Sequence, residues 1–276
     1  MFFFTKMQGT GNDFIILNYL NQKLEYSNKL LVKFLCNRHF GVGADGVLFI
    51  EKSNVADYKM RIFNSDGMEA KMCGNGIRCL AKYIYEKDLI EKDREEIKIE
   101  TLSGIKNAYL ETEGETVTNI KIDMGSPIFD KTKIPIIYDE KVEKIKIEGI
   151  ETYPISIGNP HSVCFVNDLE NFNVERYGKI IENFKYYPEG TNVEFVDIIN
   201  NKNIKIRVWE RGIGETLSCG TGACASAIIC NKYKGLEEII SVETIGGKLE
   251  VEYKKEINNI YLKGPAEFVF DGKIDI

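Results

Sequence analysis

The sequence has no long apolar run and very little histidine. Its 276 residues include two histidines and one tryptophan. No window approaches the run of roughly 20 apolar residues that a transmembrane helix needs, so we expect no membrane contact. The first residues, Met1–Thr5, lack a basic region and form too short an apolar run for a signal peptide. Seven cysteines without a secretion signal fit a reducing compartment, so we expect a cytoplasmic protein with free thiols.

The sequence also lacks the motifs of common cofactor sites. It has no phosphate-binding loop, and its two Cys-Gly-x-Gly segments lack the third glycine of a dinucleotide motif, so we expect no cofactor. No Cys-x-x-Cys occurs, which counts against a dedicated oxidoreductase. Lysine and arginine are scattered and the formal net charge is −6, so no nucleic-acid partner is expected.

One stretch of the sequence occurs twice. Residues 59–81 align without a gap with residues 205–227, which places Cys73 on Cys219. Each copy has the alternating apolar pattern of a strand, then a polar turn, the cysteine, Gly-x-Gly and an alanine-rich helix. A second pair of segments aligns at the same offset with one residue of slippage, Gly11-Asn12 and Gly158-Asn159.

The repeat predicts two similar halves, each with one cysteine at a helix N-terminus. The mixture of strand and helix patterns predicts an α+β fold, and 43% hydrophobic residues give ample core. We expect an N-terminal half over residues 1–118 with Cys73 and a C-terminal half over residues 119–263 with Cys219. The last strand, residues 264–276, is expected to return to the first half.

A cysteine at a helix N-terminus has two chemical consequences. The unpaired N–H groups and the helix dipole stabilise a thiolate. The same N–H groups bind a carboxylate, and glycines after the cysteine allow its close approach. If both corners face one cleft between the halves, a bound amino acid has a sulfur on each side of its α-carbon. That arrangement predicts racemisation by two bases, in which one thiolate takes a proton and the opposing thiol returns one.

Seven short motifs occur along the chain in a specific order. They are Gln8-Gly-Thr-Gly-Asn-Asp-Phe14, Arg38-His-Phe-Gly-Val-Gly-Ala-Asp-Gly46, Phe63-Asn-Ser-Asp-Gly67, Cys73-Gly-Asn-Gly76, Gly158-Asn-Pro-His161, Glu189-Gly-Thr-Asn192, and Glu210-Arg-Gly-Ile-Gly-Glu215 with Cys219-Gly-Thr-Gly222. In this order the chain resembles the bacterial diaminopimelate epimerases, of the cofactor-independent amino-acid racemases. The resemblance implies two domains, each with a β-barrel-like sheet around a central helix, and an active site in the cleft between them. It also implies a homodimer that interconverts LL- and meso-diaminopimelate for lysine and peptidoglycan precursor biosynthesis.

The resemblance assigns site residues by position. Cys73 and Cys219 match the acid/base pair, and His161 and Glu210 match residues that support proton transfer near the reacting amino group. The N–H groups expected to hold the reacting carboxylate belong to Gly74, Asn75, Gly220 and Thr221. The residues expected to grip the distal end of the substrate are Asn12, Asn64, Asn159, Asn192 and Arg211. Gly46, where some members carry glutamine, is the clearest variation, and no metal ligand is assigned.

Several residues also have simpler interpretations. Free cysteines are often small core residues, and we assign that role to Cys79 and Cys224. Each should lie on the side of its helix away from Cys73 or Cys219. The same argument counts against a zinc site built from each pair of cysteines. A lone histidine is usually structural, an interpretation kept for His39 and set aside for His161. The asparagines are also typical turn formers. Arg211 could belong to a surface turn, but an arginine there suits bidentate capture of a second carboxylate.

Two other functions fit the sequence. A related racemase or epimerase of proline, hydroxyproline or histidine would keep the thiol pair, but a monocarboxylic substrate has no use for Arg211 backed by asparagines. A redox protein would use Cys73 and Cys219 as a regulatory disulfide. We expect the pair to come within disulfide reach when substrate closes the two domains.

Overall fold

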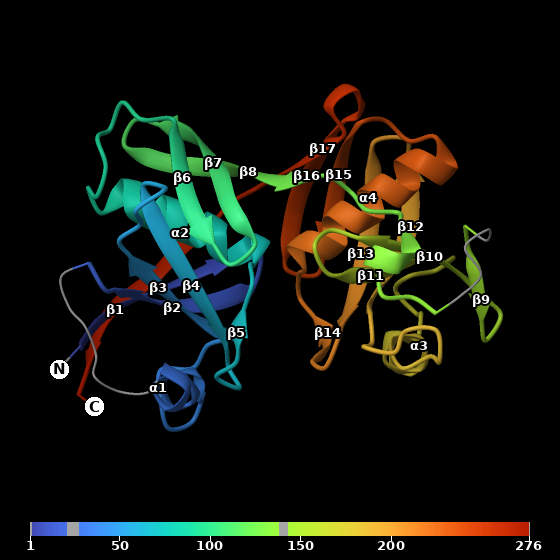
Figure 1. Ribbon diagram of the computed structural model, residues 1–276, viewed down its shortest axis with the longest axis horizontal. Coiled ribbons are helices and arrows are strands. Elements are labelled where there is room, and N and C mark those ends of the chain that lie inside the picture. Colours follow the sequence, from blue (N-terminus) through green and yellow to red (C-terminus); the bar gives the residue numbers. More distant parts are fainter. Residues whose placement is uncertain (1, 21–27, 138–142, 276) are drawn as a thin grey trace. The chain divides into compact units, whose positions relative to one another are not determined.

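The structure is a computed structural model that describes residues 2–20, 28–137 and 143–275 (Figure 1). The chain divides into two compact units, Met1–Asp123 with Lys263–Ile276 and Met124–Leu262. The sequence placed this division at residue 118 and the return of the C-terminal strand at residue 264. Among the described helices, none combines the length and the apolar character needed to cross a bilayer.

The first unit contains two described helices, α1 (Asn28–Cys36) and α2 (Gly74–Glu86). Its strands are β1 (Phe2–Gly9), β2 (Asn12–Asn18), β3 (Gly46–Glu51), β4 (Tyr58–Asn64), β5 (Glu69–Ala70), β6 (Glu96–Thr101), β7 (Gly104–Glu113), β8 (Thr116–Gly125) and β18 (Glu267–Ile274). The strands pair in the order β18-β1-β2-β3-β4-β6-β7-β8, with β5 beside β4. The pairs β2–β3 and β4–β6 are parallel and the others antiparallel, and β18 lies against β1.

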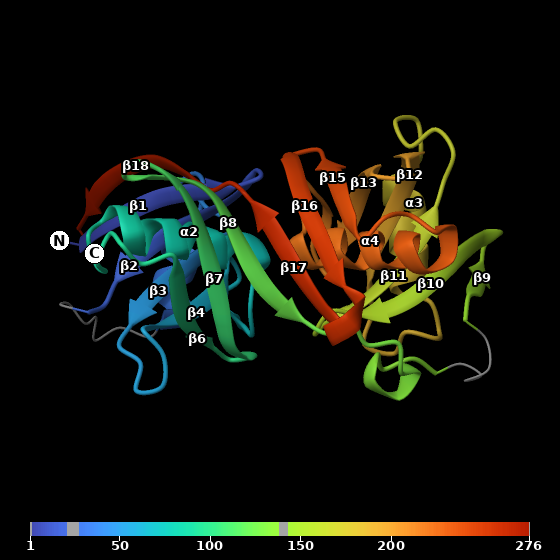
Figure 2. The same cartoon turned by 90° about the horizontal axis from the view of Figure 1, so that it is seen from above.

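The strand β3 is buried on both faces because a helix covers each of them. Val47 and Phe49 belong to the apolar cluster that includes Leu31 and Leu35 of α1. Leu48 points the other way, because successive side chains of a strand alternate. Its Cδ2 atom would lie 3.2 Å from a Cβ added to Gly76 of α2. Helix α2 therefore lies inside the curve of the strands, where Figures 1 and 2 show it, and packs on β1, β2, β3, β4 and β7.

The second unit has the same kinds of element. Its helices are α3 (Val174–Glu182) and α4 (Gly220–Lys234), with short 3-10 helices at Lys131–Lys133 and Lys255–Ile257. Its strands are β9 (Ile145–Ile147), β10 (Ile150–Ser156), β11 (Pro160–Phe165), β12 (Asn192–Asn200), β13 (Asn203–Glu210), β14 (Gly214–Thr216), β15 (Ile239–Thr244), β16 (Gly247–Lys254) and β17 (Asn259–Gly264). The pairing runs β9-β10-β11-β12-β13-β15-β16, with β14 beside β13.

The sequence repeat is present in the structure strand by strand. The pairs β11–β12 and β13–β15 are parallel, as are β2–β3 and β4–β6 in the first unit. Val47 lies opposite Phe63 in one sheet, and at the same offset Val193 lies opposite Trp209 in the other. Helices α1 and α3 begin at residues 28 and 174, the offset that also separates Cys73 from Cys219. The predicted α+β fold with two pseudo-symmetric domains is confirmed.

Each central helix is buried around nearly its whole circumference. In α2 the buried residues run from Gly74 to Tyr85 with one interruption, and in α4 they run from Gly220 to Asn231 with one interruption. A helix buried on all sides needs small side chains where strands approach closely, and α4 supplies Ala223, Ala225 and Ala227. The sheet of each unit therefore holds the N-terminus of its central helix in a fixed place.

Gly178 of α3 offers a test of how the two halves are packed. A Cβ at this position would lie 2.5 Å from Cγ of Trp209, whose Nε1 donates to Glu182 at 2.7 Å. The equivalent residues of the first unit are Val32 and Phe63, both in its apolar core. We expect Gly178→Ala to lower the free energy of unfolding by about 1–3 kcal/mol, because overpacking against an anchored ring outweighs the gain of about 1 kcal/mol in helix propensity. Urea unfolding measures this change.

The matched control is Gly178→Ala combined with Trp209→Phe, which copies the aromatic residue of the first unit. We expect this double variant to be more stable than the sum of the two single changes, because the smaller ring makes room for the added methyl group. Strictly additive losses would contradict the packing interpretation.

Candidate active site

Cys73 is the N-cap residue of α2. Its backbone is extended, with φ −142° and ψ 121°, and its Sγ atom accepts a hydrogen bond from the N–H of Gly76 at 3.5 Å. This is the contact that a serine or aspartate oxygen usually makes at a helix start. A thiol in that place sits at the positive end of the helix dipole. Cys73 is half-buried.

Asn12 of β2 holds this sulfur from the side. Its Oδ1 atom accepts from Cys73 Sγ at 3.7 Å and from Asn75 Nδ2 at 3.4 Å. Its Nδ2 atom donates to Asp45 Oδ2 at 2.8 Å, and Arg38 forms an ion pair with the same carboxylate at 2.8 Å. The amide of Asn12 is thereby fixed with its oxygen toward the thiol.

The neighbouring Asp13 anchors the start of β2 by charge. It forms ion pairs with Lys6 at 2.7 Å and with Arg38 at 2.8 Å. Burial alone would raise the pKa of Asp13, but hydrogen bonds from Arg38 and Lys6 hold it well below its usual range. Asp13 is therefore ionised at neutral pH, and the strand that carries Asn12 is tied to β1 at its first residues.

Arg78 lies beneath the first turn of α2 and is fully buried. Its guanidinium group donates to the backbone oxygen of Gly74 at 3.2 Å and to Asn75 Oδ1 at 3.0 Å. It also donates to Thr10 Oγ1 at 3.3 Å and to the carbonyl of Pro265 at 3.1 Å. One side chain thus connects the helix start, the β1–β2 turn and the segment before β18.

Cys219 is the N-cap residue of α4 and is 8% exposed. Its Sγ atom accepts from the N–H of Gly222 at 3.4 Å and lies 3.4 Å from Thr221 Oγ1. Burial, and then the carboxylates of Glu210 and Glu194, raise the pKa of the Cys219 thiol well above its ordinary value, against the effect of the two hydrogen bonds. Cys219 therefore keeps its proton at neutral pH.

A chain of polar contacts leads from Cys219 into the core. Asn159 Nδ2 donates to Thr221 Oγ1 at 3.4 Å, and Asn159 Oδ1 lies 3.0 Å from His161 Nε2. The other ring nitrogen of His161 lies 2.7 Å from Glu194 Oε1, and both of these side chains are fully buried. Both nitrogens of His161 thus have partners within the protein.

Glu210 and Arg211 lie at the end of β13, next to the start of β12. Glu210 Oε1 accepts from Thr216 Oγ1 at 2.6 Å. Asn192 Oδ1 accepts from the backbone N–H of Arg211 at 3.0 Å, while its amide nitrogen donates to a backbone carbonyl of β11 at 2.9 Å. The Arg211 side chain is exposed and donates to the carbonyl of Glu189 at 3.0 Å. Asn192 is therefore a support for Arg211, with both ends of its amide in use.

The predicted site residues fall into one group in each unit. In the first unit, Asn64 is exposed at the end of β4, where it pairs with Gly46. The other members there are Asn12, Cys73, Gly74 and Asn75. The members in the second unit are Asn159, His161, Asn192, Glu210, Arg211, Cys219, Gly220 and Thr221. The two cysteines predicted to be packing residues, Cys79 and Cys224, are fully buried.

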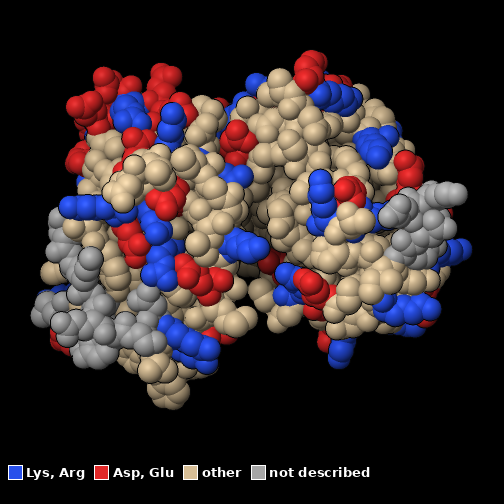
Figure 3. Space-filling view, viewed as in Figure 1, with Lys and Arg blue, Asp and Glu red and all other residues tan. Residues whose placement is uncertain are grey.

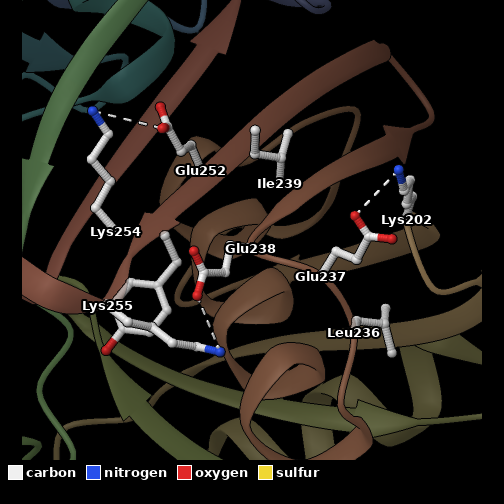
Figure 4. A pocket seen from close by; sticks show the side chains of 9 residues that line it. Lys202, Leu236, Glu237, Glu238, Ile239, Glu252, Lys254 and Lys255 are labelled. Carbon is white, nitrogen blue, oxygen red and sulfur yellow. Dashed lines mark ion pairs between the residues drawn. The ribbon is translucent and has the colours of Figure 1, made fainter.

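The second unit also has a surface hollow of about 590 Å³ that carries none of these residues (Figure 4). Its lining is charged, but the charges are paired, with Lys202 on Glu237 at 3.2 Å and Lys255 on Glu238 at 3.4 Å. On the face shown in Figure 3, acidic and basic side chains of the described residues are interspersed. Within the described part of the chain, no three His, Cys, Asp or Glu side chains are grouped as metal ligands.

A comparison with protein families shows to which family the chain belongs. A family model described as diaminopimelate epimerase matches residues 4–129 and 153–269. The chain belongs to the diaminopimelate epimerase family. Among relatives of that name, the protein from Caldanaerobacter subterraneus subsp. tengcongensis is 46% identical over 279 residues, and the one from Methanococcus maripaludis strain C5 is 44% identical over 281. Each alignment covers 99% of both chains.

Solved structures show the same fold at much lower identity. A probable proline racemase from Agrobacterium radiobacter K84 matches this diaminopimelate epimerase family chain with a TM-score of 0.74 at 13% identity, covering 100% of this chain and 93% of that one. A phenazine biosynthesis protein of the PhzF family from Bacillus anthracis matches with a TM-score of 0.72 at 19% identity, covering 100% and 99%. At this identity the two structures are evidence for the fold alone, which is the two-domain fold described above.

Sequence reasoning missed two buried charged residues that support the family motifs. Arg78 and Glu194 each lie within a buried element, where charged side chains are rare unless paired. The repeat contained the signal for both, because Arg78 aligns with Cys224 and Glu194 aligns with Leu48. A charged residue aligned with an apolar or weakly polar one marks a place where the two halves differ in chemistry.

Proposed function

We propose that this chain interconverts LL-2,6-diaminopimelate and meso-diaminopimelate without a cofactor, in the synthesis of lysine and peptidoglycan precursors. Family membership and 43–46% identity to relatives of that name support the substrate. The observation that carries the proposal is that both copies of the repeat keep a cysteine as the N-cap of a buried helix. We further propose that the protein acts as a cytoplasmic homodimer, as the family resemblance suggests.

In the proposed reaction, Cys73 and Cys219 act on opposite faces of one α-carbon. A thiolate takes the α-proton, so that the C–H bond breaks, an S–H bond forms and the electron pair moves into the carboxylate. The thiol on the other side then gives up its proton, and a new C–H bond forms with inverted configuration. The charge that develops on the carboxylate is stabilised by helix N-terminal N–H groups, those of Gly74, Asn75, Gly220 and Thr221.

The remaining site residues orient the substrate or the thiols. Arg211 is proposed to bind the distal carboxylate, because its guanidinium group is exposed and its backbone is fixed by Asn192. Asn12, Asn64 and Asn159 are proposed to complete the grip on the distal end. Glu210 is proposed to support proton transfer at Cys219. Burial is the largest cause of the raised pKa of the Cys219 thiol, and the carboxylate of Glu210 is the second.

The second candidate is a racemase or epimerase of proline, hydroxyproline or histidine. The fold is compatible with this second candidate, because a probable proline racemase has the same fold. The residues favour diaminopimelate, since a substrate with one carboxylate would leave Arg211 and its supporting asparagines without a partner.

Proton NMR of LL-diaminopimelate in D₂O with the reduced protein separates these functions. We expect one α-proton signal to disappear as solvent deuterium replaces it, with signals of the meso isomer growing in. Exchange of proline or histidine, with none of diaminopimelate, would overturn the substrate and retain the thiol mechanism. No exchange with any of these amino acids would overturn both.

A further inference from the structure

The two half-sites differ at one position beneath the central helix. Leu48 lies opposite Ile62 in the first sheet, and at the same offset Glu194 lies opposite Val208 in the second. Both side chains are fully buried. Leu48 Cδ2 would lie 3.2 Å from a Cβ on Gly76, and Glu194 Oε1 would lie 2.8 Å from a Cβ on Gly222. The same place under the helix start is therefore apolar in one unit and acidic in the other.

The strand beside Glu194 shows a matching change. Phe14 pairs with Gly46 in the first unit, and the corresponding pair in the second is His161 with Asn192. A Phe/Leu combination has thus become a His/Glu pair, with His161 Nδ1 2.7 Å from Glu194 Oε1. Burying an unpaired carboxylate is costly, so the histidine is the partner that makes Glu194 tolerable.

This buried pair is incompletely satisfied. Among the described residues, Glu194 Oε2 has no hydrogen-bond partner although it is buried. Replacing a buried ion pair with apolar groups of similar volume is often neutral or stabilising. Glu194 and His161 are therefore poorly explained as contributors to stability, since the first unit fills the same two places with apolar side chains.

A chain of polar contacts connects the pair to the thiol of its own unit. From His161 the contacts run through Asn159 at 3.0 Å and Thr221 at 3.4 Å to Cys219 Sγ at 3.4 Å. In the first unit, the sulfur of Cys73 is supported through Asn12 by Asp45, which is 44% exposed. The carboxylate linked to Cys219 is thus fully buried, whereas the carboxylate linked to Cys73 through Asn12 is partly exposed.

We propose that Glu194 is a positioning residue, which acts through His161 and Asn159 to fix the orientation and protonation of Cys219 without affecting Cys73. The expected effect of Glu194 on turnover rests on the proposed function, whereas its expected effect on the Cys219 thiol does not. The acidic groups acting on Cys219 are Glu210 of β13 and Glu194 of β12, with His161 of β11 beside the latter. After burial, both carboxylates raise the pKa of Cys219.

The first test is the isosteric variant Glu194→Gln, with Glu243→Gln as a surface control on β15. Rates of alkylation of Cys73 and Cys219 by iodoacetamide are followed by peptide mass spectrometry between about pH 7 and pH 12. Removing the negative charge should move the midpoint for Cys219 to lower pH by about half a unit or more, and leave that of Cys73 in place. An unmoved Cys219 profile, or equal shifts at both cysteines, would overturn the proposal.

The second test is the double variant Glu194→Leu with His161→Phe, which copies the first unit. We expect a melting temperature equal to or above that of the original protein, with kcat for diaminopimelate at least tenfold lower and KM within about twofold. A purely structural pair predicts the reverse, a lower melting temperature with normal kcat per folded molecule. If the original protein does not turn over diaminopimelate, the proposed function fails, and the alkylation profiles still decide the role of Glu194.

Discussion

Replacing either Cys73 or Cys219 with alanine is expected to reduce epimerisation by about 10³–10⁴-fold. Each thiol serves one face of the α-carbon, so the loss of either one blocks both directions of the reaction. The double variant should be no slower than either single variant, because residues that act as a unit give non-additive losses. Formation of the meso isomer from LL-diaminopimelate, followed by NMR in D₂O, measures all three.

The same helices provide matched controls. Cys79 and Cys224 are fully buried thiols within α2 and α4, one turn or more beyond the N-cap residues. Cys79→Ala and Cys224→Ala should each cost about 1 kcal/mol of stability, as the loss of a small buried group does, and keep turnover within a few-fold. Equal losses of activity in all four single variants would mean that helix packing, and not thiol chemistry, accounts for the effect.

Much of this architecture could be predicted because the sequence contains two copies of one unit. The cysteine, the Gly-x-Gly and the strand before them recur at one offset, and the structure repeats the helix starts and strand registers at that offset. Local chemistry explains the success at the caps. A residue that ends a polar turn and precedes Gly-x-Gly and a helical pattern is typical of a helix N-cap.

The parts that could not be predicted depend on which side of a strand meets which helix. Glu194 lies in the strand sequence Asn-Val-Glu-Phe-Val, where alternation alone indicates that a charged residue faces solvent. In the structure both faces of β12 are covered, so Glu194 is buried against α4. The sequence likewise does not reveal that both ring nitrogens of His161 have partners within the protein.

Asn192 illustrates a related limit. Its motif indicated a residue that contacts the substrate, and an asparagine side chain can donate and accept at once. The structure uses its oxygen for the backbone of Arg211 and its nitrogen for a carbonyl of β11. A motif match does not distinguish a residue that contacts the substrate from one that supports such a residue.

Gly222→Ala is expected to lower kcat by about 100-fold, the loss that a displacement of about 1 Å produces at a catalytic group. The added Cβ would lie 2.8 Å from Glu194 Oε1 and 3.3 Å from Cβ of Cys219. Glu194 cannot retreat easily, because it is fully buried and bonded to His161 at 2.7 Å. The helix start must shift instead, and with it the N–H group of Gly222 that donates to the Cys219 sulfur.

Gly76→Ala is the matched control, since Gly76 has the same place in α2. There the added Cβ meets Leu48 Cδ2 at 3.2 Å and Ile62 Cδ1 at 3.4 Å, both at the ends of apolar side chains that can turn aside. Alanine also favours the helix by about 1 kcal/mol over glycine, so Gly76→Ala should keep its melting temperature and lose less than tenfold in kcat. Equal losses at both glycines would show that any methyl group at this helix position disturbs the thiol. A loss confined to Gly222 would locate the sensitivity in the buried carboxylate beneath it, since the first unit has Leu48 in that place.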